Sequence, residues 1–526
     1  MAKIQALSPI DGAALGSFTI TQPEHIQQQL QSAKLAASAW GQLSVKARLQ
    51  KLAPLNPLLL ANLDRICDTV CKTNGKVRTD ALLGELIPIL ELQRYYQKHA
   101  VAILKPRSVF SSPLTFPFAT AKIERRPFGV VAVISPWNYP FQLAISPMLS
   151  ALIAGNAVIL KASELSLPVA ELLLSLFAEL DLPTGLVQTV TGDGETGQQL
   201  ITAGPDLVVF TGSLKTGRAV MQAAAQHPIP VLLELGGKDA MLVFANANLQ
   251  RACQAALYGA FSNSGQVCMS IERLYVEQTC FEGFLQLLLS EVDKLTLQGD
   301  LGAMSSEQQF AILQAHYDDA IAQGAKASGP FQRDGHYLKP IVLWNVNHKM
   351  RVMREESFGP LLAVMAFSDQ AEAVRLANDS EFGLNTSIWS QNLVQAETVA
   401  QQLEVGNWVI NDVIKNAGHP ALPFGGVKHS GFGRYRGAEG LRNFTYPVSG
   451  LTNRSRLTKE PNWFPYHQQG YEQFKSYMDF VYSQDSLLKR LKRNWPALMA
   501  FRQYAAIDVQ QSWQNFKQLL PWQRDY

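Results

Sequence analysis

Five short apolar runs alternate with helix-like segments between residues 129 and 235, and this alternation limits the possible folds more than any other feature. The runs are GVVAVI, NAVILK, LVQTV, DLVVF and PVLLEL. Runs of this length, rich in valine and isoleucine, are typical of strands that are buried on both faces of a parallel sheet. We therefore expect an α/β fold with a doubly wound parallel sheet, the architecture of a nucleotide-binding domain.

Helical periodicity precedes this region, and a second α/β alternation follows it. Apolar residues recur three and four positions apart between residues 24 and 100, which predicts packed helices. Beyond Gly236 the segments ANLQRACQAALYGAF, ERLYVE and FEGFLQLLLSEV predict a second α/β domain. A chain of 526 residues is long enough for two or three domains.

Composition and cysteine usage set two further limits. The hydrophobic fraction of 47% and the charged fraction of 17% are those of an ordinary globular protein. The N-terminus lacks the pattern of a secretory signal, and prolines interrupt the richest apolar stretch, residues 128–160. The five cysteines are odd in number and scattered, and Cys67 and Cys71 have no clustered histidines, so we expect neither disulfide bonds nor a metal site. These features predict a cytoplasmic protein.

Two polar residues stand on small-residue turns between apolar runs, Glu234 in VLLELGGKDA and Cys268 in FSNSGQVCMS. A thiolate adds readily to an electrophilic carbon, and the thioester that results needs an activated water for its release. The pair therefore suggests covalent catalysis followed by hydrolysis. Taken singly, a free cysteine is more often a small buried apolar residue, and a glutamate at a strand end is often a helix cap.

Five motifs accompany this pair along the chain. They are ISPWNYPF at 134–141, LKASE at 160–164, FTGS at 210–213, EESFGP at 355–360 and PFGGVKHSGFGR at 423–434. In this order and spacing the set closely resembles the aldehyde dehydrogenase superfamily, and Glu234 favours its hydrolytic, NAD(P)-dependent members over those that acylate coenzyme A. The resemblance covers residues from about 5 to 450.

The resemblance implies a cofactor domain, a catalytic domain and a small bridging segment whose strands pair between subunits. The expected ranges are 1–108 and 128–235 for the dinucleotide-binding domain, 236–434 for the catalytic domain, 109–127 and 435–450 for the bridging and oligomerisation segment, and 451–526 for a C-terminal extension. Since members of the family are dimers or tetramers, we expect a homodimer or homotetramer. No nucleic-acid partner is expected.

The resemblance also places a nicotinamide cofactor on the first sheet. GDGETG at 192–197 matches GxGxxG, but a lone match is weak, and we expect the phosphates at Gly212 and Ser213, with Trp137 beside them. Lys161 and Glu164 correspond to residues that hold the adenosine ribose, and their alternative is a solvated helix start. A carboxylate at this place repels a 2'-phosphate, which favours NAD, although the nearby lysine keeps NADP open.

Glu356 and Phe358 correspond to the residues that hold the nicotinamide ribose and wall the nicotinamide ring. A structural turn is the alternative interpretation of this segment. In the mechanism that the resemblance implies, Cys268 attacks the aldehyde carbon, and Asn138 and the backbone N–H of Cys268 stabilise the oxyanion. Hydride passes to NAD, and Glu234 activates the water that releases a carboxylic acid. A turn-forming role is the alternative for Asn138.

The residues beside the nucleophile, Val267, Met269 and Tyr139, are apolar or aromatic, and no arginine or lysine is evident near the substrate mouth. We therefore expect an apolar aldehyde, aliphatic or aromatic. His419 resembles a position found in the branch that acts on fatty and aromatic aldehydes, and a solvated loop histidine is its alternative. Three other functions stay open, namely a coenzyme A acylating enzyme, an acidic semialdehyde dehydrogenase and a catalytically silent scaffold.

Residues 451–526 differ from the rest of the chain. They contain 11 Lys or Arg against 6 Asp or Glu, and four of the nine Trp. The runs YEQFKSYMDFVY and LLKRLKRNWPALMAFRQY predict amphipathic helices, the second interrupted at Pro496. One alternative is packing across a neighbouring subunit, which the spread of aromatics slightly favours. The other is a peripheral membrane contact through four basic residues, Lys489, Arg490, Lys492 and Arg493.

Overall fold

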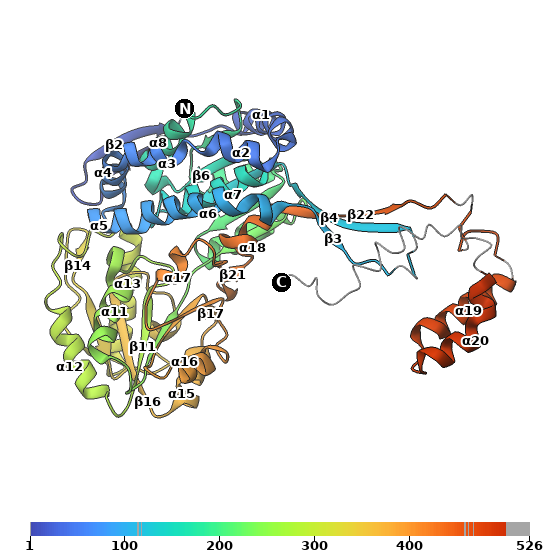
Figure 1. Cartoon of the computed structure of the whole chain (residues 1–526). Coiled ribbons are helices and arrows are strands. Elements are labelled where there is room, and N and C mark those ends of the chain that lie inside the picture. Colours follow the sequence, from blue (N-terminus) through green and yellow to red (C-terminus); the bar gives the residue numbers. More distant parts are fainter. Residues whose placement is uncertain are drawn as a thin grey trace. The chain divides into compact units, whose positions relative to one another are not determined.

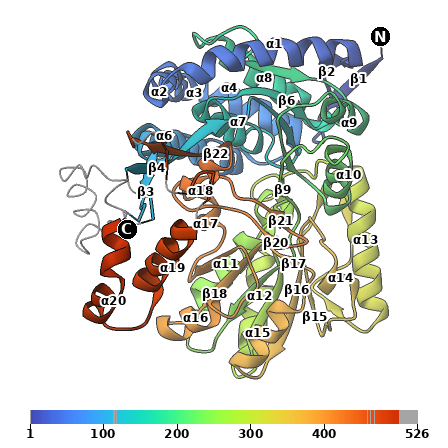
Figure 2. The same cartoon turned by 90° about the vertical axis from the view of Figure 1, so that its right-hand side faces the viewer.

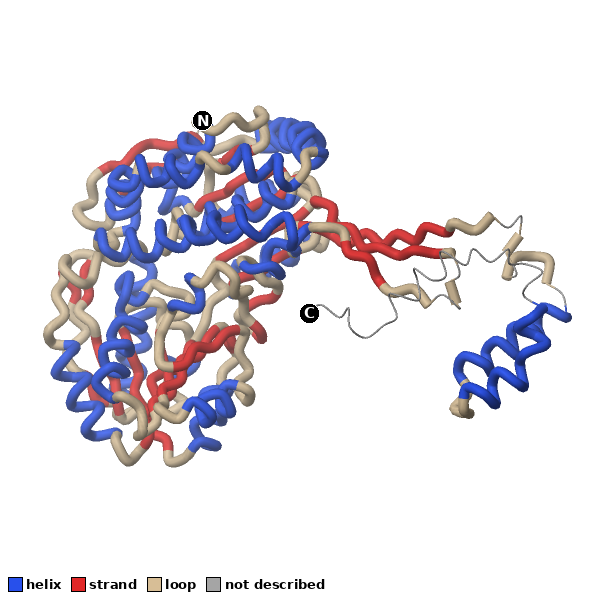
Figure 3. The backbone as a smooth tube through the Cα atoms, viewed as in Figure 1, coloured by secondary structure: helices blue, strands red, loops and turns tan. Residues whose placement is uncertain are grey.

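The computed structural model describes residues 2–112, 115–116, 118–456, 459–460, 462–466 and 468–500. The chain divides into two compact units, one formed by Met1–Leu104 with Arg126–Tyr446 and the other by Lys105–Arg125 with Pro447–Tyr526. Figure 1 labels their helices and strands, and Figure 3 colours helix and strand separately.

The first sheet has six strands in the order β21-β9-β8-β5-β6-β7. The strands from β5 to β9 are parallel, and β21 joins β9 antiparallel. All residues of β5 and β6 are buried, as expected for strands covered on both faces. The predicted doubly wound sheet is confirmed, with these bounds: β5 Val130–Ser135, β6 Ala157–Ala162, β7 Val187–Val190, β8 Leu207–Thr211, β9 Val231–Glu234 and β21 Gly431–Phe432.

Helices pack around this sheet and share one apolar core with it. The predicted helices between residues 24 and 100 are present, and α7 is buried along its whole length because each of its 13 residues is covered. The helices of this layer are α1 Pro23–Gln42, α2 Val45–Leu52, α3 Leu55–Ala61, α4 Leu63–Asn74, α5 Arg78–Ala81, α6 Ile87–Leu104, α7 Gln142–Ala154, α8 Leu167–Ala178, α9 Gly194–Thr202 and α10 Leu214–Ala224. A hairpin of β1 Lys3–Leu7 and β2 Ala14–Thr19 precedes them.

The second sheet has seven strands in the order β12-β15-β16-β11-β10-β18-β19, all parallel except β12. Successive residues of β10 belong to different apolar cores, Ala240 and Leu242 to one and Met241 and Val243 to the other. The sheet is therefore packed on both faces. Its strands are β10 Asp239–Val243, β11 Ile271–Glu277, β12 Lys326–Ala327, β15 Ile341–Trp344, β16 Leu361–Phe367, β18 Asn385–Trp389 and β19 Asn407–Ile410.

Five longer helices cover this second sheet: α11 Leu249–Phe261, α12 Phe281–Val292, α13 Glu307–Ala322, α15 Gln370–Asn378 and α16 Leu393–Ala400. Figure 2 shows the two sheets of this unit one above the other, with β9 and β21 near their junction. Residues 235–238 connect β9 of the first sheet directly to β10 of the second. This connection brings the ends of both sheets together.

The second unit contains a three-stranded sheet and a helical hairpin. The sheet order is β22-β4-β3, with β3 Arg107–Val109, β4 Ala119–Pro127 and β22 Thr445–Asn453. The hairpin consists of α19 Gln468–Tyr482 and α20 Leu487–Ala500. The expected interruption at Pro496 is wrong, because α20 continues through this residue. None of the described helices is long and apolar enough to cross a membrane, and the predictions for residues 501–526 lie outside the described part.

The expected domain limits stay a prediction. Within the expected bridging segment 435–450, however, one part is a helix of the first unit and another part is a strand that pairs with β4. Within residues 435–450, Gly437–Arg442 form the helix α18, which packs against α6 and α7 of the first unit. Leu441 and Phe444 are fully buried in the core of that unit. Only the strand β22, which begins at Thr445, pairs with β4.

Candidate active site

The candidate base and the candidate nucleophile are positioned by strands of different sheets. Glu234 is the last residue of β9, and Cys268 lies in the loop that leads into β11. Gly237 stands against this loop, since a Cβ added there would lie 2.5 Å from the carbonyl oxygen of Cys268. The small residues of LELGGKDA are therefore needed for the close approach of the two segments.

The turn before Cys268 has an unusual backbone. Asn263, Ser264 and Gly265 have φ angles of 49°, 55° and 73°, in the left-handed region that non-glycine residues rarely adopt. The Oγ of Ser264 donates to the carbonyl of Gly302 at 2.8 Å, and the Nδ2 of Asn263 donates to the carbonyl of Gln266 at 3.1 Å. Such strained conformations persist only where surrounding contacts hold them, and they cluster at functional sites.

Asn138 is buried beside this turn. Its Nδ2 donates to the carbonyl of Gln266 at 3.0 Å, and its own carbonyl accepts from the Nδ2 of Asn263 at 3.0 Å. The amide has two protons on Nδ2, so one remains for another acceptor. The loop of Asn138 and the loop of Cys268 are thus tied together by reciprocal hydrogen bonds.

A buried ion pair that was not predicted from the sequence supports the Asn138 loop. The Nζ of Lys76 lies 2.7 Å from Glu85 and also donates to the carbonyl of Asn138 at 3.0 Å, and both charged side chains are fully buried. Glu85 in turn accepts from the backbone N–H groups of Phe141 and Gln142 at the start of α7. It lies in the π-helical turn Leu82–Leu86. The available signal was a lone carboxylate in the apolar run ALLGELIPIL.

Glu234 is 4% exposed, and neither of its carboxylate oxygens has a hydrogen-bond partner among the described residues. Burial raises the pKa of this carboxyl well above its usual range, while the guanidinium groups of Arg434 and Arg436 act in the opposite direction. Buried polar groups usually have partners, so two unpaired oxygens are a marked exception. The side chain is available to bind a water molecule.

Burial also raises the pKa of the Cys268 thiol, and the carboxylates of Asp239, Glu234 and Glu356 raise it further. Both effects favour the protonated thiol over the thiolate. A nucleophilic thiolate requires a base or an added positive charge near the sulfur. The buried carboxylate of Glu234 is such a base when it is ionised.

A second unpredicted ion pair positions Glu356 and Phe358. The carboxylate of Glu272 pairs with the buried Nζ of Lys238 and accepts the backbone N–H groups of Ser357 and Phe358, the latter at 2.9 Å. Phe358 has a φ of 52°, so its backbone is held in the left-handed region. Glu272 lies in β11 and Lys238 in the connection between β9 and β10, and no local motif connects them.

Glu356 accepts from the backbone N–H of Gly237 at 3.0 Å through one carboxylate oxygen. Burial, followed by the charge of Glu272, raises the pKa of Glu356 to about 8. The rings of Trp137 and Phe358 stand edge to face with centroids 5.5 Å apart. The structure therefore places Trp137, which we expected beside the phosphates, against Phe358, which we expected at the nicotinamide ring.

Lys161 and Glu164 lie at the carboxyl end of β6, where ligands of open α/β sheets bind. Lys161 is 5% exposed, and its Nζ lies 3.8 Å from Glu164, which is too long for a strong hydrogen bond. Burial lowers the pKa of Lys161. A buried amine with an incomplete set of acceptors beside a half-exposed carboxylate fits the hydroxyl groups of a ribose.

Ser213 is the N-cap of α10, and its Oγ accepts from the backbone N–H of Thr216 at 3.2 Å. The N–H of Gly212 donates to the carbonyl of Glu234 at 3.0 Å, which joins the candidate phosphate turn to the candidate base. In GDGETG, by contrast, the side chain of Asp193 caps α9 by accepting from Glu195. An anionic side chain at that helix start disfavours a phosphate there.

A cavity of about 700 Å³ borders Cys268. Most of its wall is apolar, and it is completed by three tyrosines and by His419, whose Nδ1 accepts from the backbone N–H of Ala421 at 3.3 Å. The apolar and tyrosine residues include Leu83, Ile87, Pro88, Leu143, Val267, Met269, Val413, Ile414, Tyr139, Tyr258 and Tyr435.

The expectation that no cation lies near the substrate is wrong, because Lys415 and Arg436 line this cavity. Lys415 pairs with Asp412 at 2.9 Å. The guanidinium of Arg436 is buried, lies 5.9 Å from the ring centroid of Tyr435, and forms no salt bridge with any residue that the structure describes. Burial lowers its pKa. In the sequence, Arg436 only stands two positions after the GFGR motif. The fold determines that its side chain lines the cavity.

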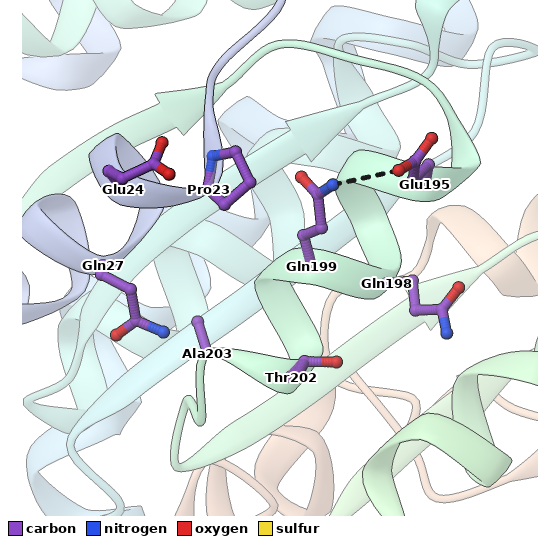
Figure 4. A pocket seen from close by; sticks show the side chains of 8 residues that line it. All are labelled: Pro23, Glu24, Gln27, Glu195, Gln198, Gln199, Thr202 and Ala203. Atoms are coloured by element: carbon purple, nitrogen blue, oxygen red, sulfur yellow. Dashed lines mark hydrogen bonds between the residues drawn. The ribbon is translucent and has the colours of Figure 1, made fainter.

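A second hollow lies between α1 and α9 and contains none of the predicted site residues. Figure 4 shows its polar lining, including the hydrogen bond of 3.3 Å from the Nε2 of Gln199 to Glu195. Two carboxylates, Glu24 and Glu195, border it. Its chemistry is unrelated to that around Cys268.

Comparison with known proteins identifies relatives over most of the chain. Residues 1–449 match the aldehyde dehydrogenase family. A 4,4'-diapolycopene aldehyde oxidase of Methylomonas is 63% identical over an alignment of 529 positions that covers 100% of both chains. A Mycolicibacterium smegmatis protein, provisionally named an NADP(+) succinate-semialdehyde dehydrogenase, is 34% identical over 84% of this chain and 87% of its own. Betaine aldehyde dehydrogenase from Staphylococcus aureus, solved in complex with NAD+, gives a TM-score of 0.81 at 28% identity, over 88% of this chain and 94% of its own.

Proposed function

Since this chain belongs to the aldehyde dehydrogenase family, we propose that it oxidises an apolar aldehyde to the carboxylic acid with NAD as the electron acceptor. One observation supports this reaction above the others. A mostly apolar cavity borders the Cys268 thiol, and the buried, unpaired carboxylate of Glu234 is near enough for its charge to raise the pKa of this thiol. A nucleophile for a carbonyl carbon and a base for water are thus present together.

In the proposed reaction the sulfur of Cys268 bonds to the aldehyde carbon and gives a thiohemiacetal. The oxyanion accepts hydrogen bonds from the free Nδ2 proton of Asn138 and from the backbone N–H of Cys268. The nicotinamide cofactor supplies the hydride acceptor when it is bound. Glu234 then takes a proton from a water molecule, which attacks the acyl carbon and releases the acid and the thiol.

Hydrogen bonds fix the backbone position of the proposed oxyanion donor Asn138. Asn138 is held through its carbonyl by Lys76 and Asn263, so its amide points from a fixed backbone. Preorganised donors of this kind stabilise developing charge without reorganisation, and removing one commonly costs about 10²–10³ in rate. Asn138→Ala should therefore lower kcat by about 10²–10³. We expect only a small change in the free energy of unfolding.

The cofactor preference rests on Glu164. Its side chain is 47% exposed at the end of β6 and is only weakly paired with Lys161. An ionised carboxylate there can accept from ribose hydroxyls but repels a 2'-phosphate. We propose NAD as the better acceptor, with Glu164→Gln expected to improve the use of NADP relative to NAD.

The substrate class rests on the lining of the cavity and on one relative. Apolar side chains form most of the wall, and the Methylomonas relative is named for oxidation of a diapolycopene aldehyde. Its identity of 63% extends over the whole of both chains. An aldehyde with a long apolar body would bury that body against this wall, at about 25 cal/mol for each Å² removed from water.

NADH formation by the purified full chain tests the proposal. The panel should include short acidic semialdehydes, long aliphatic aldehydes, aromatic aldehydes and 4,4'-diapolycopene aldehyde, each with NAD and with NADP. We expect the highest kcat/KM for the apolar members with NAD. Activity restricted to acidic aldehydes, or absent throughout the panel, would contradict the proposal.

Two variants separate the steps of the mechanism. Cys268→Ala should abolish NADH formation while leaving the fold intact, because a smaller side chain replaces a small one. Glu234→Gln should allow a burst of NADH close to one equivalent and then slow turnover, since the thioester forms but is not hydrolysed. An unchanged steady rate in Glu234→Gln would exclude this residue as the base.

An acidic semialdehyde is a second candidate substrate, and Arg436 is the observation that favours it. Its guanidinium lines the cavity without a salt-bridge partner among the described residues, and a carboxylate is its natural ligand. The M. smegmatis relative is named for such a substrate. A kcat/KM for succinate semialdehyde above that for every apolar aldehyde would favour this alternative.

A further inference from the structure

Several polar groups connect the two helices of the hairpin, α19 and α20. Arg493 forms two hydrogen bonds of 2.7 Å with the carboxylate of Asp479 and a third of 2.8 Å with Asp485. The Nδ2 of Asn494 donates to Asp479, and Arg490 donates to the carbonyl of Phe480 at 3.0 Å. The side chains of Arg493 and Asn494 in α20 thus bind the carboxylate of Asp479 in α19 and connect the two helices.

Many large apolar side chains of the hairpin are exposed, although a helix pair in water usually buries them. Among the described side chains, Gln473 in α19 and Asn494 in α20 are the most buried, and the apolar side chains of Phe474, Tyr477, Phe480, Val481 and Leu491 are half-buried. Other large apolar side chains are exposed, namely Tyr471, Met478, Tyr482, Leu487, Leu488, Trp495 and Met499. Exposed apolar surface that is contiguous on a helix marks a binding surface.

Four of the exposed residues of α20 share one face. Leu488, Lys492, Trp495 and Met499 are spaced at i, i+4, i+7 and i+11, and Leu488 and Trp495 are 81% and 54% exposed. We call these four residues the outward face of α20. The same spacing recurs in α19, with Tyr471, Lys475, Met478 and Tyr482. The pattern is therefore a repeated property of the hairpin.

The charge of α20 is entirely positive. The segment Leu487–Ala500 contains four basic residues and no Asp or Glu. Arg493 is neutralised by Asp479 and Asp485, whereas Lys489 and Lys492 form no salt bridge with any residue in the described part of the chain. Two unpaired lysines therefore accompany the exposed apolar residues, and Lys492 lies among them.

The position of Lys492 distinguishes a lipid surface from a protein surface. The cores of protein interfaces are depleted in lysine, because its charge would be desolvated there. At a bilayer surface, a lysine within an apolar face extends its charged end to the phosphates while its methylene groups stay in the apolar layer. Tryptophan and tyrosine also prefer this interfacial region. A basic amphipathic helix with these residues is typical of helices that lie in the plane of a membrane surface.

We propose that the outward face of α20 docks on the surface of an anionic lipid bilayer, parallel to the membrane and without crossing it. Leu488, Trp495 and Met499 enter the boundary between head groups and acyl chains, and Lys489 and Lys492 contact the lipid phosphates. The proposal is independent of the aldehyde that the enzyme oxidises. It would, however, place the enzyme where apolar aldehydes dissolve.

Flotation of the purified full chain with lipid vesicles tests this docking, and the full chain includes residues 501–526. One set of vesicles contains phosphatidylcholine with phosphatidylglycerol, and the other contains phosphatidylcholine alone. We expect the protein to float with the anionic vesicles at low salt and to be released as the salt concentration rises, because salt screens the attraction of the lysines. Absence of wild-type flotation with anionic vesicles would overturn the proposal.

Two variants and one control identify the surface. Lys489→Gln/Lys492→Gln should weaken the partition coefficient roughly 30-fold, from about fivefold for each lysine. Leu488→Asp/Trp495→Asp should weaken it by more than about tenfold, because both apolar contacts are lost. The control is Leu35→Asp in α1, which changes a leucine that is 77% exposed but lies outside the hairpin. It should float like the wild type.

Folding and assembly are followed in the same samples by circular dichroism and by size-exclusion chromatography with light scattering. Loss of flotation in both hairpin variants, with unchanged helix content and molar mass, would support docking on lipid. Unchanged flotation of both variants would overturn it. A lower molar mass of the hairpin variants, without wild-type vesicle binding, would assign the face to a second copy of the chain and would also overturn it.

Discussion

The buried pair of Lys76 and Glu85 allows a quantitative test of how the Asn138 loop is held. Glu85→Gln keeps the size of the side chain and one oxygen that can still accept from the start of α7, but it removes the negative charge. The Lys76 ammonium would then remain buried, with the carbonyl of Asn138 as its hydrogen-bond acceptor at 3.0 Å. Removing one partner of a buried pair typically costs about 3–5 kcal/mol.

The double variant Lys76→Met/Glu85→Gln removes both charges and should cost much less than the sum of the single changes, about 1–2 kcal/mol in total. Urea unfolding, followed by tryptophan fluorescence, gives the free energies for Lys76→Met, Glu85→Gln and the double variant. Asp181→Asn is the matched control, because Asp181 forms an ion pair with Lys51 at the surface at 2.8 Å, close to the 2.7 Å of the buried pair. It should leave the urea midpoint nearly unchanged.

Catalysis supplies the second measurement for this pair. Since Lys76 also holds the carbonyl of Asn138, Lys76→Met should lower kcat in conditions where the protein is still folded. The reasoning would be refuted if Glu85→Gln changed stability no more than Asp181→Asn. Additive single and double variants would refute it as well, because they would show that the two charges do not depend on one another.

Three further predictions concern the site itself. Burial raises the pKa of Glu356 to about 8 from an ordinary value of 4.5, so the folded protein holds this proton more tightly and its contribution to stability is lost as the pH rises from 4.5 through 8. Glu356→Gln should therefore be more stable than the wild type at pH 9 by on the order of 3–5 kcal/mol but not at pH 4, in urea unfolding without cofactor; parallel pH profiles would contradict this. Gly237→Ala should reduce kcat more than about 100-fold, because the new Cβ would lie 2.5 Å from the carbonyl oxygen of Cys268, whereas Gly283→Ala, which meets nothing within 4 Å, should be active and slightly more stable. Arg436→Leu should raise kcat/KM for long aliphatic aldehydes roughly tenfold or more and abolish any activity on acidic ones; loss of both activities to the same extent would indicate a structural role.

Local patterns in the sequence were sufficient to predict the parallel sheets and the helices that cover them. Strands such as GVVAVI are buried on both faces, so their composition alone indicates a parallel sheet. The capping role of Ser213 and the end of β9 at Glu234 are also local, and both sites occur where short motifs predicted a turn.

The supports of the site could not be predicted because they join distant segments. Lys238 and Glu272 are 34 positions apart, and the N–H groups that Glu272 binds are 85 and 86 positions further along. Neither residue stands in a recognisable motif. Arg436 was missed for a related reason, since a basic residue after a glycine-rich turn is usually solvated, and only the packing of α18 buries it in the cavity wall.

Because β9 and β10 belong to different sheets, the distance between Glu234 and Cys268 depends on the relative position of the two sheets. One residue is fixed to the first sheet and the other precedes a strand of the second, and Trp137 and Phe358 are divided between the sheets in the same way. Any rocking of one sheet against the other would change both distances together. A ligand that contacts both aromatic rings would connect the two sheets and would thereby fix the distance between the carboxylate of Glu234 and the sulfur of Cys268.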